Sequence, residues 1–190
     1  MTPRTRTSIR PASTKERIRE TFREMILEMD YNAITITELA SRVGIHRKTF
    51  YLHYECIDSL FTELEDTIIA QANDIILKGM EEFHTITIET AKYYLITLFE
   101  TDRLLYKRLF FNDSYQIICA HVYHRIVALM TPHIKQNLDI SNEEAIIVTN
   151  FIVTGYFQVM RNCQKNNQTI SEEKLNCMLL SLINTGIRNI

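Results

Sequence analysis

The chain has 190 residues, of which 46% are apolar and 23% are charged, and its formal net charge is −2 at pH 7. These values are ordinary for a folded globular protein of one or two domains. Four glycines and three prolines are too few for a β-rich fold with many turns, and Leu, Ile, Met, Glu and Lys recur at helical periods, so the composition predicts an all-α fold.

The charge is distributed unevenly along the chain. Residues 1–54 contain ten Lys and Arg against six Asp and Glu, a net charge of +4, and the remainder contains eleven against seventeen, a net charge of −6. A basic head on an acidic body suits a polyanionic partner at one end only.

The four cysteines show no CxxC spacing, so we expect free thiols in a reducing compartment. The chain begins with no apolar signal-peptide region, and no apolar run approaches the roughly 20 residues of a membrane span. We therefore expect a cytoplasmic protein without a membrane partner.

Residues 1–12 are polar and basic and predict a flexible arm, which either reaches a DNA groove or stays a solvated tail. Residues 13–30 predict the first helix. Ser13 followed by Glu16 is a capping box. An apolar stripe follows at helical spacing and consists of Ile18, Phe22, Met25, Ile26 and Met29.

Residues 34–54, ITITELASRVGIHRKTFYLHY, predict two short helices around a tight turn. Thr35 and Glu38 have the spacing of another capping box. Gly44 then follows the first helix, where glycine takes the left-handed conformation without steric cost. The second helix places Phe50 and Tyr54 on an inner face and leaves a basic, hydroxyl-rich outer face. This is the helix-turn-helix pattern, although an ordinary helical hairpin has the same outline.

The sequence of this stretch resembles that of the DNA-binding domain of the TetR/AcrR family of transcription regulators. The match lies at Thr35, Leu39, Ala40, Gly44, Ile45, Thr49, Phe50, Tyr51, His53 and Tyr54. The resemblance implies an all-α protein of about nine helices, with a three-helix DNA-binding domain over 13–55 and a helical regulatory and dimerisation domain over 56–190. It implies a regulator, specifically a repressor, that binds a palindromic double-stranded operator as a homodimer and releases it when a small-molecule effector binds the second domain.

The second helix of the motif predicts two kinds of DNA contact. Arg47, Lys48 and Thr49 lie in its first turn, the part that reaches base edges in this motif. Tyr51 and His53 match phosphate-binding positions of the family. The complete set of expected DNA-binding residues is Thr35, Thr37, His46, Arg47, Lys48, Thr49, Tyr51, His53 and Tyr54.

Two positions depart from the family pattern. At the N-cap of the second helix of the motif, where the family usually has a small residue, this chain has His46, which caps poorly. Lysines that commonly follow the motif are replaced by Glu55 and Ile57. This loss supports an alternative function, a helical interaction or ligand-binding protein whose degenerate head no longer binds DNA well.

The second domain predicts a ligand pocket and a dimer interface. The expected pocket residues are Tyr93, Tyr94, Phe110, Phe111, His121 and Tyr156, although plain core packing explains any single aromatic residue as well. Two C-terminal helices are apolar on more than one face, which indicates a second partner, although two core helices would also fit. The expected interface residues are Phe151, Gly155, Val159, Leu175, Met178, Leu179 and Leu182.

Enzymatic and metal-dependent functions find little support. Cys119 points about 200° away from His121 on a helix, so these residues with His124 make a poor metal site. The sequence contains no GxSxG, Walker A or HExxH motif. We expect no catalytic residues, no metal and no cofactor.

Overall fold

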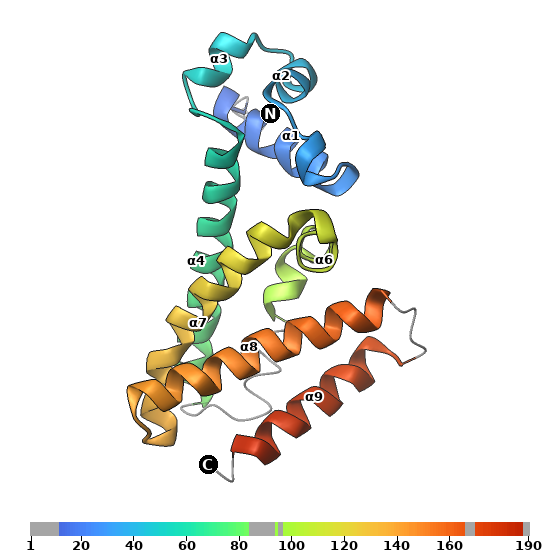
Figure 1. Ribbon diagram of the computed structural model, residues 1–190. Coiled ribbons are helices and arrows are strands. Elements are labelled where there is room, and N and C mark those ends of the chain that lie inside the picture. The colour runs from blue at the N-terminus through green and yellow to red at the C-terminus, as the bar shows by residue number, and fades with distance from the viewer. Residues whose placement is uncertain (1–11, 84–93, 95–96, 166–169, 188–190) are drawn as a thin grey trace, which may run out of the picture. The chain divides into compact units, whose positions relative to one another are not determined.

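The computed structural model describes residues 12–83, 94, 97–165 and 170–187 (Figure 1). Within these ranges the secondary structure is helical and contains no strand, which confirms the all-α prediction. The arm and Tyr93 lie outside the described residues. The chain divides into two compact units, Met1–Leu60 and Phe61–Ile190, and the division falls inside α4 (Ile57–Phe83).

The first unit is built on α1 (Thr14–Glu28), η1 (Tyr31–Ala33), α2 (Ile36–Val43) and α3 (Arg47–Tyr51). The Ser13 capping box is confirmed, because the Ser13 amide donates to Glu16 at 2.6 Å and the Glu16 amide donates to Ser13 Oγ at 3.2 Å. The hydrogen bond from the Ser13 amide also lowers the pKa of the Glu16 carboxyl. The predicted stripe on α1 is buried at Ile18, Phe22, Met25 and Ile26.

The turn between α2 and α3 depends on Gly44. Its φ of 73° is left-handed, as predicted, and its amide bonds the carbonyls that end α2. The Arg17 guanidinium on α1 donates to the carbonyl of Val43 and so caps α2 from a neighbouring helix. The predicted capping box at Thr35 is half formed: Thr35 Oγ1 accepts from the Glu38 amide, but the Glu38 carboxylate accepts from Arg42 at 2.9 Å.

The second unit contains the rest of α4, a helical stretch over 97–101, α6 (Arg103–Phe111), η2 (Asp113–Tyr115), α7 (Gln116–Leu138), α8 (Asn142–Lys165) and α9 (Glu172–Ile187). Helix α6 begins after Asp102, whose carboxylate accepts a hydrogen bond from the Leu105 amide and so caps the helix. Helices α7 and α8 pack against each other, and α9 lies beside α8 (Figure 1).

Gly79 lies inside helix α4 and does not end it. Helix α4 continues through Gly79 to Phe83. A Cβ atom added at position 79 would lie 2.0 Å from Cε1 of Tyr94. The glycine therefore does not end the helix but lets an aromatic ring lie directly against its backbone.

Aromatic rings form the centre of the second unit. The Phe157 ring lies 5.0 Å from Phe110 and 4.8 Å from Tyr123, and Phe99 lies 6.1 Å from Phe157. Stacked and tilted rings at these distances add to the free energy gained from burying their surface. This cluster joins the stretch over 97–101 to α6, α7 and α8.

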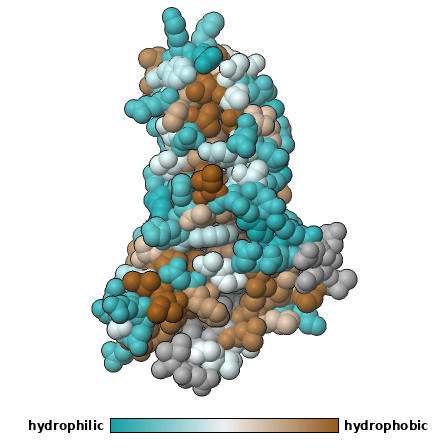
Figure 2. Space-filling view, in the orientation of Figure 1, coloured by the Kyte–Doolittle hydropathy of each residue, from teal (hydrophilic) through white to brown (hydrophobic). Residues whose placement is uncertain are grey.

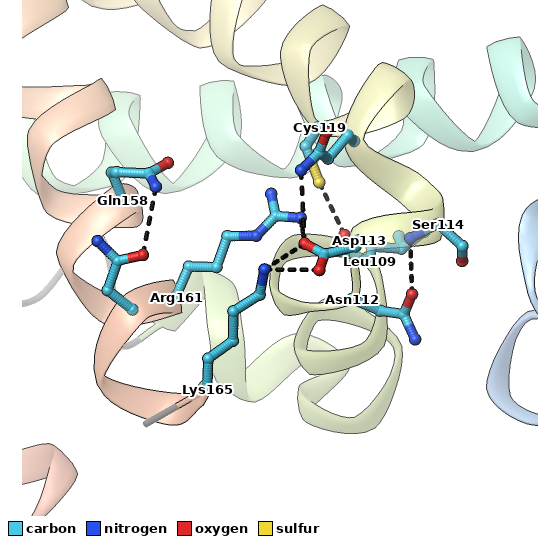
Figure 3. A network of polar contacts seen from close by, with 10 residues as sticks. Leu109, Asn112, Asp113, Ser114, Cys119, Gln158, Arg161 and Lys165 are labelled. Atoms are coloured by element: carbon cyan, nitrogen blue, oxygen red, sulfur yellow. Dashed lines mark hydrogen bonds and ion pairs between the residues drawn. The ribbon is translucent and has the colours of Figure 1, made fainter. Parts of the chain in front are cut away.

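A charged network ties η2 to the last turns of α8 (Figure 3). The Asp113 carboxylate accepts from the Arg161 guanidinium and from Lys165 Nζ at 2.5 Å and 2.6 Å. Arg161 is buried, so Asp113 supplies the charge that compensates it. The hydrogen bonds from Lys165 and Arg161 lower the pKa of the Asp113 carboxyl.

This network makes stability depend on pH. Because the folded pKa of Asp113 is lowered, its contribution is present above the ordinary value of 3.8 and is lost as the pH falls through the lowered value. We expect Asp113→Asn to lower the urea midpoint at neutral pH and to leave it unchanged in strong acid. The effect should shrink in high salt, because the carboxylate is exposed. Asp139→Asn, at a left-handed position that asparagine tolerates, is the control. An Asp113→Asn deficit that persists in strong acid would contradict the assignment.

Cys119 is a packing residue and not a reactive one. Its thiol donates to the Leu109 carbonyl at 2.7 Å, and burial raises its pKa to about 12. A thiol in this state is protonated at neutral pH and is a poor nucleophile or metal ligand. In the described ranges, no three His, Cys, Asp or Glu side chains are close enough together to hold a metal ion.

Helix length and hydropathy show whether a helix could span a membrane. Among the helices that the structure describes, none combines the length and the apolar character needed to cross a bilayer.

Candidate nucleic-acid interface and apolar cavity

Helix α3 is short and is held by one fully buried ring. Phe50 is 0% exposed, and its ring centroid lies 5.7 Å from those of Tyr51 and Tyr54. The backbone of His46 starts the helix by accepting from the amides of Thr49 and Phe50, while the His46 side chain makes no capping bond. The predicted weakness of His46 as a cap is therefore confirmed, and its ring lies exposed beside α3.

Most of the expected DNA-binding side chains lie at the surface of the first unit. Exposed residues are Thr35, Thr37, His46, Arg47, Lys48, Tyr51 and His53, and Thr49 is half-buried. Tyr54 differs, because it is only 6% exposed and packs on Phe50. The Lys15 ammonium lies over the Tyr54 ring at 5.3 Å. Tyr54 is thus an anchor of α3, and sequence spacing had placed it correctly on the inner face.

The cations of the first unit fall into two groups. Arg42 pairs with Glu28 at 2.6 Å and with Glu38 at 2.9 Å, and these hydrogen bonds raise its pKa. In the described part of the chain, neither Arg47 nor Lys48 forms an ion pair. Arg47 Nη2 donates to the neutral Tyr51 hydroxyl at 3.5 Å, one helical turn away. The described residues of the first unit therefore do not neutralise the positive charge at the start of α3.

The second unit contains an apolar cavity of about 60 Å³. It is partly open, and its described lining comes from α4, α7, α8 and two residues of the segment before α6. The lining residues are Ala72, Ile75, Ile76, Tyr94, Leu98, Ile126, Met130, Ile152, Val153, Tyr156 and Phe157. An apolar concave site with a few polar groups is the usual character of a small-molecule site.

The expected pocket residues divide between the cavity and other sites. Tyr94 and Tyr156 line it. Phe110 lies in the aromatic cluster, Phe111 stacks on Phe99 at 5.9 Å, and His121 Nδ1 lies 3.1 Å from the Glu65 carboxylate. Sequence reasoning missed the aliphatic walls, because a Leu or Ile that faces a void has the same helical periodicity as one that fills a core.

An apolar surface runs along α8 and α9. Exposed fractions are 69% for Ile147, 73% for Phe151, 46% for Met178 and 68% for Leu182, with Val159 at 37%. Hydrophobic atoms gather where these helices lie (Figure 2). We call these five residues the α8–α9 face. Cβ atoms added at Gly155 and Gly186 would meet no atom within 4 Å.

Two expected interface residues are less accessible than the face. Leu175 is 7% exposed and belongs to the core of the second unit, and Leu179 is half-buried. Among the expected interface residues of α9, Met178 and Leu182, spaced by one turn, are the exposed ones. The sequence did not separate these two sides of α9, because both are apolar.

Comparison with solved structures finds the same fold in transcription regulators. The fatty acid degradation regulator FadR from Bacillus halodurans has a TM-score of 0.67 at 14% identity, covering 94% of this chain and 98% of that chain. The TetR family repressor AlkX from Dietzia sp., implicated in biodegradation of n-alkanes, has a TM-score of 0.57 at 14% identity, covering 94% and 97%. A transcriptional regulator from Aquifex aeolicus has a TM-score of 0.57 at 19% identity, covering 93% and 99%.

The chain therefore has the fold of the TetR-type transcriptional regulators, and the structures that share it are regulators rather than enzymes. By sequence, no protein-family model and no curated protein matches it.

Proposed function

We propose that this protein is a DNA-binding transcription regulator of the TetR/AcrR type, acting as a repressor in the cytoplasm. It binds a palindromic operator as a homodimer and releases it when a small molecule occupies the second unit. The observation that carries the proposal is the start of α3, where Arg47 and Lys48 project from a buried anchor without an ion pair in the described residues.

The local geometry supports a division of roles on α3. Arg47, Lys48 and Thr49 form its first turn, so they reach base edges when the helix enters a major groove. Arginine binds guanine bidentately, which distinguishes base pairs by about 1–3 kcal/mol. Tyr51 and His53 follow on the exposed surface and bind phosphates, as do Thr35 and Thr37 at the start of α2.

Dimerisation is supported by the α8–α9 face. Several large apolar side chains exposed on two neighbouring helices favour burial against a copy of the same surface. A two-fold dimer presents two copies of α3 about one helical turn of DNA (~34 Å) apart, or at a somewhat longer distance, on a palindrome. Effector binding then favours a conformation that fits the operator poorly, which requires different effector affinities in the two conformations.

The alternative is an interaction or ligand-binding protein with a degenerate head. Glu55 is exposed and Ile57 is half-buried at the positions where the family commonly has lysines, so a phosphate contact is replaced by a carboxylate. DNA binding discriminates between the two functions. Fluorescence anisotropy should be measured on DNA from upstream of the protein's own gene and on scrambled DNA, across a salt series.

For a specific regulator we expect roughly a thousandfold preference for the upstream DNA and a steep decrease of affinity with salt. Weak binding that is equal on both DNAs would contradict the proposed function and favour the alternative.

Substitutions on α3 test the division of roles. Arg47→Ala and Lys48→Ala should each reduce the preference for cognate DNA at particular base pairs, by about 1–3 kcal/mol. Tyr51→Phe should weaken binding to all sequences alike, because a phosphate contact carries no base information. Lys135→Ala, which removes one exposed positive charge from α7, is the matched control and should leave the preference unchanged. Equal losses on cognate and scrambled DNA for the three α3 variants would contradict the base-reading roles.

A further inference from the structure

Leu52 places a large apolar side chain at the end of α3, on an otherwise polar surface. It is 80% exposed, the highest value among the large apolar side chains of the described residues. In the described part of the first unit, the other exposed side chain of this class is Tyr51, whose hydroxyl accepts from Arg47. Because the fold does not bury Leu52, contact with a partner is the way in which this side chain can leave water.

The position of Leu52 on the helix relates it to Lys48. Its φ of −74° and ψ of −16° are right-handed helical values, so helical spacing extends to Leu52 although α3 ends at Tyr51. The Leu52 amide donates to the Thr49 carbonyl at 3.3 Å. Residues four apart on a helix lie on one face, and Leu52 therefore lies one turn beyond Lys48.

The charges beside Leu52 indicate the kind of partner. Arg47 and Lys48 are exposed and form no ion pair in the described residues, so a partner that covers this surface meets two cations. Double-stranded DNA brings phosphates to such a surface. The apolar group that DNA presents at its base edges in the major groove is the C5 methyl of thymine, which apolar side chains contact.

We propose that Leu52 reads a thymine in each half-site of the operator by packing against its C5 methyl group. This inference rests on the proposed function and adds a base preference to it. One helical turn rises about 5.4 Å and one base pair about 3.4 Å, so the thymine lies within about two base pairs of the pair that Lys48 reads. Cytosine has no methyl group there and gives Leu52 no apolar contact.

Deoxyuridine tests this contact directly, because it pairs with adenine as thymine does and lacks only the methyl group. The DNA is the shortest duplex from upstream of the protein's own gene that keeps the preference over scrambled DNA. Each thymine is replaced in turn, and the affinity of the full-length protein is measured by fluorescence anisotropy at fixed salt. We expect one thymine per half-site whose replacement lowers the affinity about fourfold, or about fifteenfold when both half-sites are replaced.

Three variants assign the methyl contact to a side chain. Leu52→Ala should lower the affinity for the thymine duplex and remove the difference between the thymine and deoxyuridine duplexes. Leu52→Met keeps a flexible apolar side chain and should preserve that difference. Leu104→Ala removes a leucine that is 69% exposed on α6 and is the matched control, which should behave like the wild type.

Four results would overturn the proposal. The first is that no thymine shows a deoxyuridine effect that depends on Leu52. The second is that Leu52→Ala binds the upstream DNA as tightly as the wild type, which leaves Leu52 to a protein partner or to solvent. Equal losses on upstream and scrambled DNA in Leu52→Ala would assign Leu52 to the DNA backbone. A deoxyuridine effect that Thr49→Ser removes and Leu52→Ala keeps would assign the methyl contact to Thr49.

Failure of this inference is distinguishable from failure of the proposed function. Specific binding of the upstream DNA without a Leu52-dependent thymine refutes the base contact and leaves the regulator proposal intact. Weak binding that is equal on upstream and scrambled DNA refutes both. Circular dichroism checks that each variant folds, and truncation of an exposed side chain should cost little stability. If Leu52→Ala does not fold, a wild-type scan without any sensitive thymine, or Leu52→Met without the difference, still overturns the proposal.

Discussion

Replacing Phe151 with glutamate is expected to separate the proposed homodimer into monomers and to lower the affinity for cognate DNA at least about a hundredfold. Phe151 is the most exposed residue of the α8–α9 face, at 73%. In a two-fold dimer both protomers carry the substitution, so two carboxylates enter one apolar interface, where neither has a partner. The loss of DNA affinity follows because two half-sites no longer bind as one unit.

Light scattering after size-exclusion chromatography measures the mass, and anisotropy measures the affinity. Leu104→Glu is the matched control, because Leu104 is 69% exposed on α6, outside the face. It should leave both the dimer and its DNA affinity intact. A Phe151→Glu protein that remains dimeric, or a Leu104→Glu protein that dissociates, would place the interface elsewhere.

Phe50→Ala is expected to destabilise the first unit by about 3–5 kcal/mol, the usual cost of removing a fully buried phenylalanine. Phe50 contacts the rings of Tyr51 and Tyr54 and is the buried residue of α3. A helix of five residues has little stability of its own, so its position depends on this anchor. DNA binding should be lost together with the fold of α3.

Urea denaturation followed by circular dichroism, with anisotropy on cognate DNA, measures both effects. Leu52→Ala is the control two positions away, where the side chain is 80% exposed and its removal should change the free energy of unfolding little. A Phe50→Ala variant that binds DNA like the wild type would show that α3 is positioned by other contacts.

The helix ends at Ser13 and Gly44 were predicted from the sequence because capping is local. Ser13 accepts a hydrogen bond from the Glu16 amide, and Gly44 takes the left-handed conformation. Each of these signals needs only a few neighbouring residues. The division of α3 into buried Phe50 and an exposed basic surface follows from helical spacing in the same way.

The composition, the periodicity and the sequence of the motif therefore determined the all-α fold, several helix ends and the position of α3. Tertiary structure alone decided the contacts between distant segments: Asp113 with Arg161, Gly79 against Tyr94, and the aliphatic walls of the cavity. It also decided that Leu175 is core while Leu182 is surface. The physical reason is that hydrophobic burial is non-directional: an apolar residue specifies that it avoids water, and only packing specifies whether it meets a core, a cavity or a partner.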